Sequence, residues 1–274
     1  MNSAITKAEA VACLRAEGCV FAEREVDLIW SCSGDDEVRT RRVAERASGT
    51  PLEYVVGCAE FAGVVVEIGP PVFVPRHRAE ALVLAALTYG ADRDLLTVLD
   101  LGCGCGAIAA ALARRRSPWQ VHASDVDELA LIYARRNATT YGFDVHRSNW
   151  FTQLPEGMRG RFDLVVAHLP YVPTSELALL PRDFRDHEAT TAVDGGDDGL
   201  DPWRAVCASA DPWLRTGGLL LTQVARHQAT GAVAIAAECG WAADVAASAD
   251  PTEESGEDAD VVVLVAGRAP GPRP

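Results

Sequence analysis

The stretch from Thr97 to Ala113, TVLDLGCGCGAIAAALA, constrains the fold of this chain more than any other part of the sequence. A short apolar run, interrupted by Asp100, leads into three alternating glycines and then into a run of alanine, isoleucine and leucine. This pattern is typical of a β-strand, a tight loop and an α-helix. Glycines let the backbone approach a ligand closely, and the free amides at a helix start attract polar or negative groups. The stretch therefore predicts a nucleotide-binding turn.

The residue that precedes the glycines suggests which nucleotide binds. Gly102, Gly104 and Ala107 also satisfy the dinucleotide pattern G-x-G-x-x-A, and an acidic residue, Asp125, follows about twenty residues later. However, Asp100 would repel a pyrophosphate, whereas it can hold an ammonium group. We therefore favour S-adenosylmethionine, which carries an ammonium and a sulfonium and no phosphate. A dinucleotide, or a turn without any ligand, is the alternative.

The rest of the chain after this turn alternates between predicted strands and helices. Strands are expected at residues 97–101, 120–124, 145–147, 162–167, 218–224, 242–247 and 261–266. Such alternation predicts an α/β fold in which helices cover both faces of a mostly parallel sheet. Ligands of such folds lie at the carboxyl ends of the strands.

Polar residues at predicted strand ends should meet in one crevice there. Asp125 can accept both ribose hydroxyls of a nucleoside, and Asn149 can pair with an adenine edge under the apolar cover of Trp150 and Phe151. Packing of these two rings in the core is the alternative. We expect the cofactor to contact the following residues: Asp100, Gly102, Cys103, Gly104, Gly106, Asp125, Val126, Asn149, Trp150 and His168.

The stretch FDLVVAHLPYVPT is the most informative one after the glycine loop. Its apolar strand ends in His168, Leu169, Pro170 and Tyr171, which places a polar ring and an aromatic ring beside the methyl donor. Strand-end Pro-Tyr segments fix a flat group by stacking and backbone hydrogen bonds. We therefore predict that His168, Pro170 and Tyr171 hold the acceptor, with His168 as an orienting group or a base.

Composition limits the partners of the chain. The net charge of −14 argues against a nucleic-acid substrate, because phosphate binding requires clustered lysine and arginine. The eight cysteines are scattered without zinc-ligand spacing, which favours free thiols in a reducing compartment and no metal. The sequence has neither a long apolar run nor a signal-like leader, so we expect a soluble, cytoplasmic protein without membrane contact.

The 274 residues divide into regions with different sequence patterns. Residues 1–49 predict three short helices, which would form a cap or a substrate-docking domain. Residues 50–76 alternate apolar and β-branched residues between glycines and prolines, which predicts a β-hairpin linker. Residues 77–267 would form the cofactor-binding domain, and residues 268–274 a disordered tail.

The chain resembles the HemK/PrmC family of S-adenosylmethionine-dependent protein-glutamine methyltransferases from about Glu23 to Ala266. The matching stretches are GTPLEYVVGCAEFAG, VFVPRHRAEALV, VLDLGCGCGAIA, ASDVDELAL, HRSNWF and EATTAVDGGDDGLDPWRAV. The last stretch and the helical cap are specific to the family among methyltransferases.

This resemblance implies a Rossmann-like seven-stranded sheet, with Asp100, Gly102 and Gly104 around the methionine part of the donor and Asp125 on the ribose. It also implies methyl transfer to a glutamine side-chain amide in a protein such as a translation release factor. The chain departs from the family's Asn-Pro-Pro-Tyr pattern at His168 and Leu169. A small-molecule or other nitrogen or oxygen acceptor, and a non-catalytic donor-binding protein, are therefore alternatives.

Overall fold

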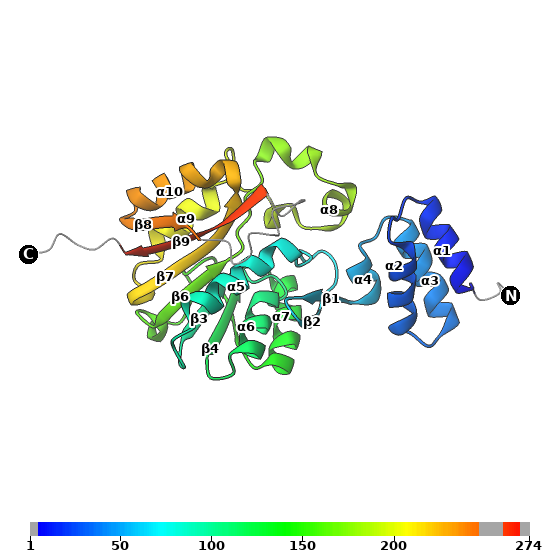
Figure 1. Ribbon diagram of the computed structural model, residues 1–274, viewed down its shortest axis with the longest axis horizontal. Coiled ribbons are helices and arrows are strands. Elements are labelled where there is room, and N and C mark those ends of the chain that lie inside the picture. Colours follow the sequence, from blue (N-terminus) through cyan, green and yellow to red (C-terminus); the bar gives the residue numbers. More distant parts are fainter. Residues whose placement is uncertain (1–4, 247–259, 269–274) are drawn as a thin grey trace, which may run out of the picture.

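The computed structural model describes residues 5–246 and 260–268, which build a helical cap, a small hairpin and a large α/β body (Figure 1). The body contains a seven-stranded sheet in the order β5-β4-β3-β6-β7-β9-β8. Its strands are β3 (Thr97–Leu101), β4 (Gln120–Asp125), β5 (Asp144–Arg147), β6 (Phe162–Ala167), β7 (Leu214–Ala225), β8 (Trp241–Val245) and β9 (Val261–Arg268). The predicted α/β sheet is thus confirmed.

The strand order places the ligand crevice. From β3 the chain proceeds to β4 and β5 on one side, and then crosses to β6 on the other side of β3. All of these neighbours are parallel, whereas β9 runs antiparallel to both β7 and β8. The reversal between β3 and β6 is the switch point at which open α/β sheets bind ligands.

Helices cover both faces of the sheet (Figure 1). One apolar core includes Val98 and Leu164 together with the helices on the first face, and the other includes Leu99 and Val165 together with the helices on the second face. Successive strand residues enter opposite cores because their side chains alternate. The first face carries α5 (Glu80–Tyr89), α6 (Ala107–Arg115) and α7 (Glu128–Tyr141), and the second carries α9 (Asp201–Ser209) and α10 (Ala229–Glu238).

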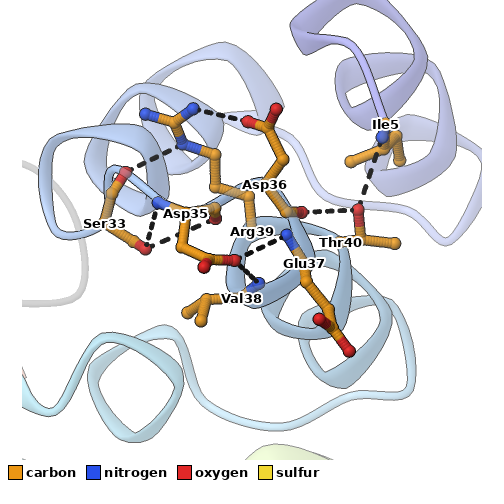
Figure 2. A network of polar contacts seen from close by, with 8 residues as sticks. All are labelled: Ile5, Ser33, Asp35, Asp36, Glu37, Val38, Arg39 and Thr40. Atoms are coloured by element: carbon orange, nitrogen blue, oxygen red, sulfur yellow. Dashed lines mark hydrogen bonds and ion pairs between the residues drawn. The ribbon is translucent and has the colours of Figure 1, made fainter. Parts of the chain in front are cut away.

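The cap has its own small core. Its helices are α1 (Lys7–Ala16), α2 (Ala22–Ser31) and α3 (Asp36–Ala47), which lie within the region predicted to be helical. Figure 2 shows how α3 begins: the Asp35 carboxylate accepts hydrogen bonds from the backbone N–H groups of Glu37 and Val38. Arg39 reaches back to Asp36 and to the Ser33 carbonyl. Arg39 therefore has its partners inside the cap.

One helix in the linker was not expected. The sequence predicted only strands between Thr50 and Pro75, but α4 (Leu52–Val56) precedes the hairpin of β1 (Cys58–Phe61) and β2 (Val64–Glu67). Val55 and Val56 of α4 are buried in the cap core. This burial outweighs the preference of valine for strands.

The end of the described chain also differs from the prediction. Arg268, expected in a tail, is the last residue of β9. Its guanidinium pairs with Asp211 and lies 4.7 Å from the ring centroid of Trp241. The other residues of the predicted tail, 269–274, lie outside the described residues. Within the described ranges, no helix has the length and apolar character needed to cross a membrane.

Candidate active site

A cavity of about 410 Å³ opens at the carboxyl ends of β3, β4 and β6. Most residues of the predicted cofactor set line it: Asp100, Gly102, Cys103, Gly104, Asp125, Val126, Asn149, Trp150 and His168. The structure therefore brings together side chains that lie up to 68 positions apart, from Asp100 to His168. Their roles toward a ligand stay predictions.

Asp100 is the most deeply buried acid of this cavity, at 1% exposure. Its Oδ2 accepts a hydrogen bond of 3.0 Å from the backbone N–H of Ala109, at the start of α6. Its Oδ1 is buried and has no hydrogen-bond partner among the described residues. Burial raises the pKa of Asp100 to about 7, although the Ala109 hydrogen bond opposes this shift. An ammonium group of a ligand would satisfy the free oxygen and favour its charge.

Asp125 ends β4 and joins the glycine loop. Its Oδ2 accepts from the Gly104 N–H at 2.8 Å, and its Oδ1 accepts from the Asp127 N–H at 2.9 Å. Each oxygen keeps a further lone pair, so the carboxylate can still accept from two hydroxyls. Burial raises the pKa of Asp125, while these backbone hydrogen bonds lower it. The cap of α7 is supplied by Asp127, which accepts from Leu129 N–H.

Gly106 is the predicted cofactor residue that does not line the cavity. It begins α6 with a φ of 81°, and a Cβ built on it would lie 2.9 Å from Phe143. Glycine is needed here for the left-handed backbone and for packing against Phe143. Cys103 and Cys105 both line the cavity, and burial raises the pKa of each thiol, so both are neutral.

The loop after β5 supplies the far wall of the cavity. Asn149 and Trp150 line it, as predicted, whereas Phe151 is 1% exposed and stacks on Trp213 at 6.0 Å in the core. Val126 is 56% exposed and also faces the cavity, so it offers an apolar surface that a flat ring can cover. This end of the cavity suits an adenine.

The His168 segment separates two hollows. His168 and Pro170 line the main cavity, and both also line a smaller hollow of about 30 Å³ that contains Tyr171. The ring centroids of His168 and Tyr171 are 6.1 Å apart. Burial, with the charges of Arg78 and Arg76, lowers the pKa of His168 to about 4. His168 is therefore a neutral imidazole at pH 7.

A loop that the sequence analysis did not assign to the site holds this segment. Val172 pairs with Asp194 in a parallel bridge, and Gln228 Nε2 donates to the Tyr171 carbonyl at 2.8 Å. Gly199 has a φ of 77°, and a Cβ on it would lie 2.3 Å from the Tyr171 carbonyl oxygen. The VDGGDDGLD part of the family stretch thus supports the residues that follow β6.

Two further cavity walls were missed. One is the segment after the hairpin, including Val72 and Phe73, and the other is residues 189–192. Arg76 forms an ion pair with buried Glu188, and Ala189 N–H donates to the Pro71 carbonyl, so these walls are joined. The sequence did contain a signal that could have identified these walls, because both lie in stretches that carry the family resemblance, VFVPRHRAEALV and EATTAVDGGDDGLDPWRAV.

The cavity as a whole fits S-adenosylmethionine. The free Asp100 oxygen matches its ammonium, the Asp125 carboxylate matches its ribose hydroxyls, and the apolar face of Val126 matches its adenine. A pyrophosphate would instead meet two carboxylates. No cluster of three or more metal-ligating side chains occurs in the described part of the chain.

The sequence is similar to known methyltransferases. A family described as "Methyltransferase domain" matches residues 98–187. The release factor glutamine methyltransferase of Gloeobacter violaceus is 40% identical over 192 residues, covering 69% of this chain and 65% of that protein. The chain thus spans just under two thirds of that relative. The release factor glutamine methyltransferase of Moorella thermoacetica is 34% identical over 223 residues, covering 75% of this chain and 78% of that protein.

Solved structures support the fold. A T. thermophilus 16S rRNA N2 G1207 methyltransferase, solved with AdoMet and guanosine, aligns with a TM-score of 0.54 at 19% identity. The alignment covers 77% of this chain and 50% of that one. At this identity the likeness concerns the fold alone, and it confirms the expected Rossmann-like methyltransferase architecture.

Proposed function

The chain belongs to the release factor glutamine methyltransferase family, and on this premise we propose that it methylates the side-chain amide nitrogen of a glutamine in a translation release factor. The observation that carries the proposal is the convergence of Asp100, Asp125 and the His168 segment on one cavity at the switch point of the sheet. The net charge of −14 also favours a protein acceptor over a nucleic acid.

The donor half of the cavity binds and orients S-adenosylmethionine. Asp100 holds the ammonium, Asp125 holds the ribose, and Asn149 with Trp150 faces the adenine. When bound, this donor supplies a methyl group that passes to the glutamine nitrogen as the carbon–sulfur bond breaks, with the electron pair staying on sulfur and one proton leaving the nitrogen. The chain contributes mainly by positioning the methyl group and the glutamine nitrogen relative to each other and by excluding water from the cavity.

The acceptor half consists of His168, Pro170 and Tyr171. Because its pKa is about 4, His168 is a neutral imidazole and a weak base at neutral pH. His168 therefore acts as an orienting group that forms hydrogen bonds. Tyr171 provides a flat surface beside it.

The test is an incubation of the purified protein with labelled S-adenosylmethionine and a release factor that carries its Gly-Gly-Gln loop. We expect label on that glutamine by peptide mass spectrometry and none on a release factor whose loop glutamine is alanine. His168→Ala should abolish transfer, while the dissociation constant for the donor changes by less than about tenfold. Label on a small-molecule extract but not on the release factor would overturn the proposal.

A further inference from the structure

We propose that Arg78 contacts the acceptor together with His168: Arg78 donates to the carbonyl oxygen of the glutamine amide, and His168 accepts from its nitrogen. Arg78 lies in the short turn before α5, far in sequence from β6. The proposal rests on the proposed function, because it specifies how that acceptor is held.

The first observation is a pair of unsatisfied nitrogen atoms in one place. Arg78 Nε and His168 Nε2 are both buried, and neither has a hydrogen-bond partner among the described residues. Both residues line the small hollow, and His168 also faces the main cavity. Buried polar groups without partners are rare in folded proteins, so such a pair points to a ligand that supplies the partners.

The second observation is that both groups lie near one aromatic ring, that of Tyr171. The Arg78 guanidinium carbon lies 6.0 Å from the centroid of the Tyr171 ring, and the His168 centroid lies 6.1 Å from it. The Arg78 backbone is held in place, since its carbonyl accepts from Gln223 Nε2 at 2.7 Å. The guanidinium and the imidazole therefore both lie beside the same aromatic ring.

The third observation concerns charge. Arg76 forms an ion pair with Glu188, but no ion pair of Arg78 occurs in the described ranges. The positive charge of Arg78 also helps to keep His168 neutral, which leaves one ring nitrogen with a lone pair. Arg78 thus retains free donors and at the same time preserves the acceptor on its neighbour.

These two groups match a primary amide. An amide offers N–H donors on nitrogen and an acceptor on oxygen. A neutral imidazole nitrogen can pair with an N–H, but in that role it has nothing to give the oxygen. The guanidinium supplies this missing donor, so the pair contacts both the nitrogen and the oxygen of a glutamine amide. A carboxylate has no N–H group to donate to the imidazole, so it cannot form both contacts.

A mutant cycle tests the proposal. The Arg78→Met variant should lower kcat/KM for the release factor by about 10- to 100-fold, the usual cost of losing a hydrogen bond from a charged group. Its dissociation constant for S-adenosylmethionine should change by less than about threefold. The control Arg116→Met, which also removes an arginine above an aromatic ring, should leave kcat/KM within about twofold of wild type.

The second arm uses His168→Asn, because an asparagine carries an N–H donor and an acceptor in one group. In this background Arg78→Met should cost less than about fivefold. Equal losses in both backgrounds, or no loss in the wild-type background, would overturn the proposal. Absence of methylation by the wild-type protein would overturn both it and the proposed function. If the methionine variant unfolds, Arg78→Gln provides the same comparison.

Discussion

Of two ionisable side chains in the site, one must be charged and the other uncharged. Asp100 must be an anion to hold an ammonium, whereas His168 must be neutral to accept a hydrogen bond. Burial favours the uncharged form of both, so it raises the pKa of Asp100 to about 7 and lowers the pKa of His168 to about 4. The same burial therefore helps His168 and works against Asp100. The buried charge of Asp100 destabilises the ligand-free protein, and the ammonium group of a bound ligand would offset this destabilisation.

Asp100→Asn should make the ligand-free protein more stable and abolish donor binding. The raised pKa means that the folded state holds the proton more tightly than the unfolded chain, so the cost of Asp100 is absent below about pH 4 and complete above about pH 7. The free energy of unfolding of the variant should exceed that of wild type by about 4 kcal/mol at pH 8 and be close to it near pH 4.

Urea unfolding at both pH values and calorimetric titration with S-adenosylmethionine provide the measurements. Wild-type affinity for the donor should also fall as the pH is lowered below about 7, by up to about tenfold per unit, because Asp100 is then protonated before binding. A stability difference that is the same at pH 4 and pH 8 would show that ionisation of Asp100 is not its cause.

Single residues could be predicted where strand periodicity fixed their position. Asp100, Asp125 and His168 were placed at strand ends, and all of them line the cavity. The contact of Gly106 with Phe143 could not be predicted, because Phe143 follows a different helix. Arg78 was not singled out, since no local pattern shows that its side chain reaches the β6 end of the sheet.

At the scale of elements, the glycine loop is held in place from the hairpin. Asn137 of α7 is 2% exposed, and its Nδ2 donates to the Glu67 carbonyl at 3.0 Å and to the Cys105 carbonyl at 2.9 Å. Its Oδ1 accepts from the Glu67 N–H at 2.8 Å. One buried amide thus joins α7, β2 and the loop that faces the cofactor.

Asn137→Ala should lower the free energy of unfolding by about 2–4 kcal/mol, because three backbone groups, of which the Cys105 carbonyl is buried, lose their partner at once. The matched control is Asn149→Ala, which removes an exposed amide and should change stability by less than about 0.5 kcal/mol. Urea denaturation monitored by circular dichroism measures both. A loss no larger than that of the control would contradict the structural role of Asn137.

Elements were predictable where apolar runs are bounded by turn residues. The bounds of β3 and β6 match the prediction, since each is an apolar run with a clear stop. The sequence analysis named no helix between residues 168 and 217, where α8 (Arg182–His187) and α9 occur. The fold of this segment depends on contacts with Pro71 and Gln228, which lie outside it in the sequence.

At the scale of the whole molecule, the cap and the active site are connected through α4. Its valines belong to the cap core, while the Tyr54 hydroxyl of the same helix donates to the Val72 carbonyl at 2.6 Å. Val72 lines the cavity. Any partner that shifts the cap therefore acts on a segment that forms a wall of the donor site.

Tyr54→Phe should lower the free energy of unfolding by about 1–2 kcal/mol, because the Val72 carbonyl loses its donor. The substitution should also raise the dissociation constant for S-adenosylmethionine by about two- to fivefold, since the cavity wall is less restrained. Tyr89→Phe, at a tyrosine that is 44% exposed, serves as the control and should change neither quantity. Equal effects of the two substitutions would rule out a special link at Tyr54.

The position of β9 in the sheet has a consequence for biosynthesis. β9 lies between β7 and β8, although both of these precede it in the chain. As the ribosome delivers the chain from its amino end, the strands that face the cavity and the loop that holds Tyr171 emerge before β9 does. β7 then presents an open edge, and β8 has no strand to join until β9 arrives. Nascent chains at this stage already contain every residue of the cavity, yet they expose a sheet edge on which chaperones or neighbouring chains can act.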